Sequence, residues 1–257
     1  MIVDAHQHFW DPARAAYPWM TDEVAEIRRR FGPDDLEPVL REHGVAGTVV
    51  VQARHSLDET RWLLDLAAST PFVLGVVGWV DLTGDVAQQL ADLDGPLVGV
   101  RHQVHDEHDP GWLLREDVQR GIGAVGEAGL AFDLLVRTRE LPAAVATARR
   151  NPGMRFVLDH VAKCPREPAE RAAWERGVHE LAEHANVTCK LSGLVTEGDP
   201  AGTAARALAW FGPERCMFGS DWPVCLLGAG YGEALRLAGE DEAVRSGTAI
   251  ATYRLTT

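Results

Sequence analysis

The chain begins MIVDAHQH (residues 1–8), a short apolar run that ends in two histidines separated by one residue. Because side chains alternate along an extended strand, His6 and His8 are expected to point to the same side. Two imidazoles on one side can bind one metal ion or one substrate; the alternative is a pair of histidines that hydrogen-bond to backbone carbonyls. The stretch predicts a strand that delivers two imidazoles at its carboxyl end.

Apolar runs of strand length recur along the chain, and helical stretches lie between them. Eight strands are expected, at residues 2–5, 45–52, 72–80, 97–102, 130–136, 154–160, 187–191 and 216–219. Most are rich in Val, Ile, Leu or Phe without strict alternation, which is typical of strands covered on both faces. Helices are expected at 35–43, 57–68, 85–93, 117–128, 141–149 and 170–184, with stop signals such as Gly44 and Gly129.

Eight strand-helix units in 257 residues predict an α/β protein, a (β/α)₈ TIM barrel that forms one domain over residues 1–257. A doubly wound open sheet produces the same local pattern and is the alternative. In a barrel the catalytic groups lie at the carboxyl ends of the strands. The least regular stretches, 12–33 and 194–212, both follow strands, and we expect them to cover the site.

Composition narrows the possible partners. The formal charge of −13 repels nucleic-acid backbones and anionic membrane surfaces, which leaves a small molecule as the expected partner. The four cysteines are widely spaced and form no C-x-x-C pair, so buried free thiols are expected. With no signal-like start and no run of 18 apolar residues, a cytoplasmic location is expected. The sequence does not determine the oligomeric state, and a homo-oligomer is one of the possibilities.

Two more strand ends carry reactive side chains. His160 closes the run 154–160, and Asp221 follows the run 216–219. Asp221 alone could cap the turn that continues into Trp222-Pro223. Together with His6 and His8, however, these residues would converge over one barrel mouth. Such a set suits one divalent metal ion, with zinc as the preferred candidate, and leaves a coordination position open for water. Alternatively, Asp221 could act as general base without a metal.

Further polar and aromatic residues near strand ends are candidates for substrate binding. These are Arg101, His102, Lys190, Trp79 and Trp222. The charged ones could hold a carbonyl or hydroxyl oxygen, and the alternative for them is a structural ion pair. The tryptophans could form the base of a sugar-binding pocket; the alternative is that they pack within the protein at the barrel rim. Lys163 follows His160 closely enough to reach the same barrel mouth, although a solvated lysine is expected, and His105 and His108 are expected on the surface.

Five motifs, in this order, resemble the amidohydrolase superfamily: DAHQHFWD (4–11), GVRH (99–102), VLDH (157–160), KLSG (190–193) and GSDWP (219–223). The nearest resemblance is to the amidohydrolase-2 branch, which includes L-fuconolactonase, L-rhamnonolactonase and, more distantly, pyrone-dicarboxylate lactonase. It runs almost from end to end. It implies a distorted (β/α)₈ barrel in which His6, His8, His160 and Asp221 form the site, Asp221 activates water and Arg101 binds substrate.

The resemblance also implies a chemistry. We expect a hydrolase that opens a small sugar lactone, an aldonolactone like L-fuconolactone, with one divalent ion or none. Asp133 stands where many metal-rich superfamily members carry a histidine, and no bridging carbamylated lysine is apparent, so two metals are not expected. The alternatives are a zinc-dependent decarboxylase of the aminocarboxymuconate-semialdehyde type and a non-catalytic barrel that binds a sugar acid. The segment after Leu194 looks shorter than in the lactonases, and the tail 228–257 is only loosely similar.

Overall fold

The computed structural model describes residues 1–256 and contains one parallel sheet of eight strands in sequential order. The strands are β1 (Val3–Gln7), β2 (Gly47–Val51), β3 (Val73–Gly78), β4 (Leu97–His102), β5 (Ala131–Leu134), β6 (Phe156–Leu158), β7 (Val187–Leu191) and β8 (Cys216–Phe218). Beyond the carboxyl ends of β1 and β8, His8 N donates to Trp222 O (2.7 Å) and Asp221 N donates to His6 O (2.8 Å). These bonds bring the first and last strands together, and the predicted barrel is confirmed.

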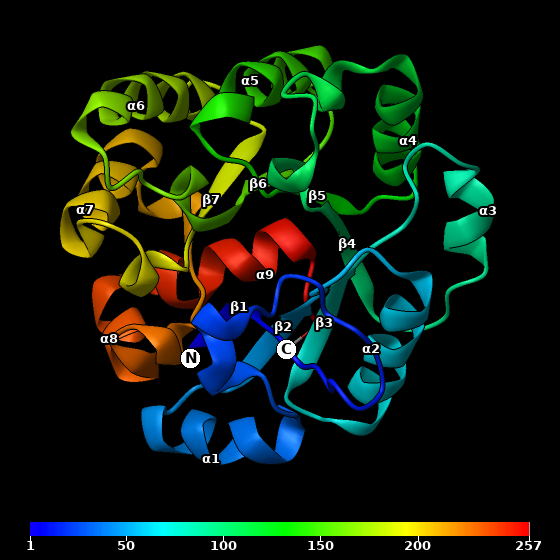
Figure 1. The fold of residues 1–257 in the computed structure, drawn as a ribbon, viewed down its shortest axis with the longest axis vertical. Helices are drawn as coiled ribbons and strands as arrows, with labels where there is room; N and C mark the ends of the chain where they lie inside the picture. The colour runs from blue at the N-terminus through cyan, green and yellow to red at the C-terminus, as the bar shows by residue number, and fades with distance from the viewer. Residues whose placement is uncertain (257) are drawn as a thin grey trace.

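Helices surround the strands (Figure 1). They are α1 (Pro33–His43), α2 (Leu57–Ser69), α3 (Val86–Ala91), α4 (Glu116–Glu127), α5 (Leu141–Arg150), α6 (Pro168–Ala182), α7 (Pro200–Phe211), α8 (Gly230–Leu237) and α9 (Thr248–Tyr253). The first six match the expected helices to within a few residues. Gly44 ends α1 in the left-handed conformation, as its place in the sequence predicts.

The stretch 194–212 is not the irregular segment that the sequence led us to expect. It contains α7, which begins with Pro200 in its first turn and is capped by Asp199, whose side chain accepts a hydrogen bond from Gly202 N (3.2 Å). Proline at a first helical position and aspartate before it are both helix-start signals. The stretch 12–33 is less regular and contains only a short 3₁₀ helix, η1 (Asp22–Ile27).

The last helix, α9, lies within the ring of strands, unlike the others (Figure 1). Its buried residues Ala249 and Tyr253 pack, together with Leu255, against interior side chains of the strands such as Val49 and Val157. The tail therefore fills part of the barrel interior. All four cysteines are buried and unpaired, which confirms the expected free thiols. Among residues 1–256, no helix has the length and apolar character needed to cross a bilayer.

Candidate active site

Two histidines and one aspartate meet where β1 and β8 end. His6 Nε2 lies 3.2 Å from His8 Nε2. The carboxylate oxygen Oδ1 of Asp221 lies 3.2 Å from His8 Nε2 and 3.6 Å from His6 Nε2. All three residues are buried. The alternation expected for β1 therefore brings both imidazoles to one point, and the bond from Asp221 N to His6 O ties that point to the end of β8.

Contacts on the far side of each ring, a hydrogen bond for His8 and a carboxylate contact for His6, fix which nitrogen faces this point. His8 Nδ1 lies 2.7 Å from the carbonyl oxygen of Val51, so it carries the proton and leaves Nε2 with a free lone pair. His6 Nδ1 lies 3.4 Å from Asp159 Oδ1, while Arg101 Nη1 donates to His6 Nε2 (3.2 Å). Both Nε2 atoms are therefore unprotonated: that of His8 has a free lone pair, whereas that of His6 accepts from Arg101 and would give up this bond if it bound a cation.

This donor set fits a divalent cation. In a tetrahedral site with bond lengths of about 2.0–2.1 Å, neighbouring ligand atoms lie about 3.3 Å apart. The three separations among His6, His8 and Asp221 are 3.2, 3.2 and 3.6 Å. The two unprotonated Nε2 atoms and the carboxylate oxygen form an electron-rich group, which a cation would stabilise. The set His6, His8 and Asp221 can thus hold one ion.

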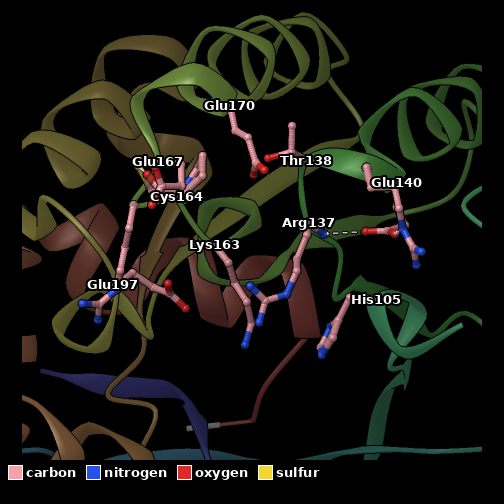
Figure 2. Close-up of a pocket in the computed structure, with 12 residues that line it drawn as sticks. His105, Arg137, Thr138, Glu140, Lys163, Cys164, Glu167, Glu170 and Glu197 are labelled. Carbon is pink, nitrogen blue, oxygen red and sulfur yellow. Dashed lines mark hydrogen bonds and ion pairs between the residues drawn. The ribbon is translucent and has the colours of Figure 1, made fainter.

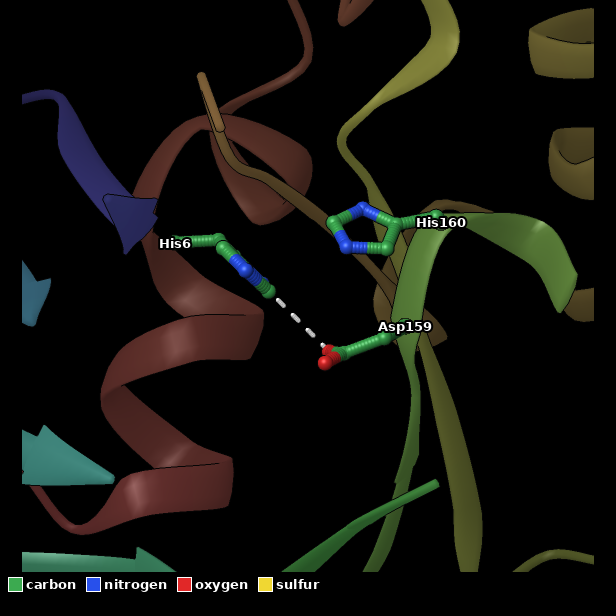
Figure 3. A group of neighbouring side chains, drawn as sticks. All are labelled: His6, Asp159 and His160. Atoms are coloured by element: carbon green, nitrogen blue, oxygen red, sulfur yellow. Dashed lines mark ion pairs between the residues drawn. The ribbon is translucent and has the colours of Figure 1, made fainter. Parts of the chain in front are cut away.

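His160 approaches His6 from the end of β6. The two ring centroids are 4.5 Å apart, and Ser192 Oγ lies 2.9 Å from His160 Nδ1. Figure 3 shows His160 and Asp159, neighbours in sequence, both directed toward His6. Together with His6 they form a second buried group whose possible ligand atoms lie within 4.8 Å of one another.

An unusual backbone makes this placement possible. The four residues 160–163 all have positive φ values between 50° and 56°. Non-glycine residues avoid this left-handed region, at a cost of about 1–2 kcal/mol each. Strain of this kind is concentrated at functional sites, where the surrounding structure maintains it. The turn directs both His160 and Lys163 toward the carboxyl end of the barrel.

Asp159 is a site residue that the analysis of single strand ends did not select. It is fully buried, and besides His6 it contacts Arg101 (Nη1 to Oδ2, 2.9 Å) and Lys190 (Nζ to Oδ1, 3.2 Å). Arg101 also donates to the carbonyl oxygen of Gln52, which fixes its guanidinium. Asp159 therefore contacts His6 of β1, Arg101 of β4 and Lys190 of β7 at the same time. The only signal in the sequence was its place beside His160 in the VLDH motif.

Burial and mutual contacts set the charges in the site. Burial lowers the pKa of His6 well below its usual value and that of His160 to about 4, so both are neutral near pH 7. Burial alone would raise the pKa of Asp221, but His160, His8 and His6 outweigh it and hold that pKa below its usual range. The site thus presents neutral imidazoles and an ionised carboxylate, the protonation states suited to binding a cation and to accepting a proton.

A cavity of about 200 Å³ opens above these residues. His8, His160, Asp221 and Arg101 line it, and so do Trp10 and Trp19. Two further lining residues differ from expectation: Lys163 takes the alternative of reaching the barrel mouth, and His105, expected on the surface, borders the cavity. The left-handed turn at 160–163 brings Lys163 inward, and the turn after β4, where His105 N donates to Leu135 O (3.3 Å), does the same for His105.

The comparison with protein families identifies the group to which this architecture belongs. The family model described as Amidohydrolase matches residues 3–255, almost the whole chain. The chain belongs to this amidohydrolase family. The resemblance seen in its five motifs is therefore confirmed.

Relatives of this amidohydrolase include two named lactonases. An L-fucono-1,5-lactonase of Burkholderia ambifaria is 44% identical over 241 residues, which cover 90% of this chain and 83% of the relative. An L-fucono-1,5-lactonase of Burkholderia multivorans is 38% identical and covers 98% of this chain and 96% of the relative. Among solved structures, an amidohydrolase from Burkholderia multivorans with bound zinc superposes with a TM-score of 0.94, at 36% identity over 100% of both chains.

The structure places Lys190 away from the cavity of the amidohydrolase. It is fully buried in the barrel interior and pairs with Asp133 (Nζ to Oδ2, 2.5 Å) as well as Asp159. Tyr253 of α9 donates to the same Asp133 carboxylate, at 2.8 and 2.9 Å. The structural ion pair, the alternative weighed for this residue, is what the geometry shows. Asp133 is accordingly a partner of Lys190 and has no place among the possible metal ligands.

The remaining candidates also lie outside the lining of the cavity. Trp79 Nε1 donates to His102 Nδ1 (3.1 Å), and His102 Nε2 lies 2.7 Å from Glu107. Trp222 is buried and packs edge-to-face on Phe31. Of the five residues considered for substrate binding, only Arg101 borders the cavity. The aromatic walls come from Trp10 and Trp19, which the sequence analysis did not select.

Proposed function

We propose that this amidohydrolase opens the ring ester of a small sugar lactone, of the L-fucono-1,5-lactone class, by addition of water. The observation that carries the proposal is the ionised Asp221 carboxylate, which lines a small cavity beside His8 and His160. The two L-fucono-1,5-lactonases at 44% and 38% identity support the choice of substrate class. A cavity of about 200 Å³ lies below the range of about 300–1,000 Å³ typical of drug-sized ligands, which favours a single ring.

Asp221 is the proposed general base. Its pKa lies below the usual range, so it is ionised at neutral pH, and its place in the lining of the cavity lets it accept a proton from a water as that water attacks. The oxygen of that water forms a bond to the lactone carbonyl carbon, and the bond from this carbon to the ring oxygen then breaks. The proton returns to the ring oxygen, which becomes a hydroxyl, and the product is an aldonic acid that ionises at neutral pH.

Arg101 is the proposed partner of the oxygen that becomes negatively charged. It borders the cavity, and its guanidinium is held in place by Asp159 (2.9 Å) and by the carbonyl oxygen of Gln52. Donors fixed before the reaction stabilise developing charge more than mobile ones do, because no reorganisation is required. Trp10 and Trp19 offer aromatic faces for the apolar side of a sugar ring.

His6, His8 and Asp221 would hold a divalent cation in this proposal, with His160 at the second buried group beside them. A divalent ion supplies Lewis-acid chemistry, because it polarises carbonyl groups and lowers the pKa of water. The zinc bound to the similar Burkholderia multivorans amidohydrolase supports zinc as the first candidate. Asp159 and the Val51 carbonyl orient the two imidazoles for this role.

Acid release from a panel of lactones tests the proposal. Wild type and Asp221→Asn would be incubated with L-fucono-, L-rhamnono- and L-galactonolactones in a pH-indicator assay, with aromatic carboxylic acids assayed for carbon dioxide release. Turnover of at least one sugar lactone, lost in Asp221→Asn, is expected. Carbon dioxide release without lactone opening would favour the decarboxylase, and ligand binding without any turnover would favour a sugar-acid-binding barrel.

A further inference from the structure

A second cavity adjoins the catalytic one, and Lys163 and His105 border both. Figure 2 shows the side chains of Lys163, Arg137 and His105 reaching into the same space, whereas Glu170 lies on the opposite side. Among residues 1–256, neither the Lys163 ammonium nor the Arg137 guanidinium forms an ion pair or a side-chain hydrogen bond with the protein. Two neighbouring cations are thus free of close ion pairs, although Glu197 also lines this cavity and acts on Lys163 from a longer distance.

His105 adds a third unmatched group at the same place. Its Nδ1 atom is buried and has no hydrogen-bond partner, although its Nε2 lies 3.3 Å from Asp106 Oδ1. Buried polar atoms normally find a partner, and one that lacks it often marks a place where a ligand binds. Burial lowers the pKa of Lys163; Asp221 and Glu197 oppose this shift, and Arg137 adds to it.

The composition of the chain points to Lys163 as well. Of the 25 lysines and arginines, only Lys163 and Lys190 are lysines. Lys190 is fully buried in an ion pair, whereas Lys163 faces the cavity at the end of the strained left-handed turn. Lysine presents a compact charge on a flexible chain and differs from arginine in how it binds an oxygen anion. A lysine held there at the cost of backbone strain is consistent with a binding role.

We infer that Lys163, Arg137 and His105 form a carboxylate-binding subsite beside the hydrolytic centre, an inference that rests on the proposed lactone hydrolysis. Two sources of carboxylate fit the chemistry. One is the carboxylate that ring opening creates on the product, and the other is a free carboxylate carried by the lactone itself. In both cases the ammonium and guanidinium donate charge-assisted hydrogen bonds to the carboxylate oxygens.

Direct binding tests the subsite without requiring turnover. Calorimetry would measure the affinity of L-fuconate for wild type, Lys163→Met and Arg137→Met at fixed ionic strength. Loss of one hydrogen bond to a charged group should raise Kd about tenfold or more. Arg166→Met is the matched control, because Arg166 borders the same cavity but donates to Thr196 O (2.7 Å) and is exposed. Thermal unfolding and the charge-preserving Lys163→Arg variant separate misfolding from loss of the subsite.

Kinetics with two lactones then distinguish the sources. If the subsite binds the product, both Met variants raise the inhibition constant of L-fuconate and leave the KM of D-glucaro-1,4-lactone, which carries a free carboxylate, unchanged. If it binds the carboxylate carried by the substrate, the KM of D-glucaro-1,4-lactone rises, while the KM of neutral L-fucono-1,5-lactone stays unchanged. The inference is overturned if L-fuconate affinity changes equally in Arg166→Met, or if both Met variants keep the L-fuconate affinity and the KM of D-glucaro-1,4-lactone within about twofold of wild type. A wild type that binds L-fuconate through Lys163 yet opens no lactone would refute the proposed function alone.

Discussion

Replacing Gly193 with alanine should damage catalysis although no catalytic residue is itself replaced. Gly193 has φ +67°, and a Cβ there would lie 2.6 Å from His160 Nδ1 and 3.3 Å from Asp221 Oδ2. Real Cβ contacts are essentially never shorter than 3.0 Å and are ordinary from 3.4 Å, so His160 must move by about 0.4–0.8 Å. The movement would also break the contact between His160 Nδ1 and Ser192 Oγ, which is 2.9 Å long.

The expected loss follows from that displacement. A misplacement of about 1 Å in an active site can reduce the rate by about 10²-fold, and we expect kcat/KM of Gly193→Ala to fall by this order. The left-handed backbone adds an instability of about 1–2 kcal/mol, which lowers Tm by a few degrees. Initial rates of lactone opening and thermal unfolding would be measured on the same protein preparation.

Gly44→Ala separates the steric effect from backbone strain. Gly44 has φ +66°, close to that of Gly193, but no atom lies within 4 Å of the position of its Cβ. It should lose similar stability and keep wild-type kcat/KM. The reasoning is refuted if Gly193→Ala retains activity within about threefold of wild type, or if Gly44→Ala loses as much.

Three further changes test other parts of the account. Tyr253→Phe removes the hydroxyl that donates to Asp133, and should lower Tm by about 5 °C in thermal unfolding. Burial lowers the pKa of His102 to about 4 from its usual 6.5. This histidine therefore contributes up to about 3 kcal/mol of stability, which is complete above about pH 6.5 and is lost as pH falls toward 4. The free energy of unfolding in urea should therefore differ less between pH 7.5 and pH 5 for His102→Gln than for wild type. His8→Ala should bind zinc at least about tenfold more weakly in a chelator competition titration, and equal affinity would exclude His8 as a ligand.

The sequence was sufficient where local periodicity decides the structure. Alternation along β1 correctly placed His6 and His8 together, and eight apolar runs with helices between them predicted the barrel. Alternation fails at the end of β6. That strand stops at Leu158, and the positive φ of His160 lets it and Asp159 both approach His6. A strict strand would have sent these neighbours to opposite faces.

Contacts between distant segments explain what the sequence did not predict. Lys190 could not be assigned to the interior without knowing that Tyr253, in a tail of unremarkable sequence, enters the barrel and shares Asp133 with it. Lys163 looked like a surface lysine, because only the left-handed turn directs it inward. Trp79 and Trp222, near strand ends, were expected to line a sugar pocket, but they do not border the cavity. Trp19, in the long connection after β1, borders it.

The measurement that tests the central claim most directly is kcat/KM for L-fucono-1,5-lactone, compared between wild type and Asp221→Asn after both have been supplied with zinc. The account predicts acid release by wild type with kcat/KM of about 10⁴ M⁻¹s⁻¹ or more, and a loss of about 10²–10⁴-fold in a folded Asp221→Asn. Acid release by wild type at the spontaneous rate, or an Asp221→Asn variant as active as wild type, would contradict it.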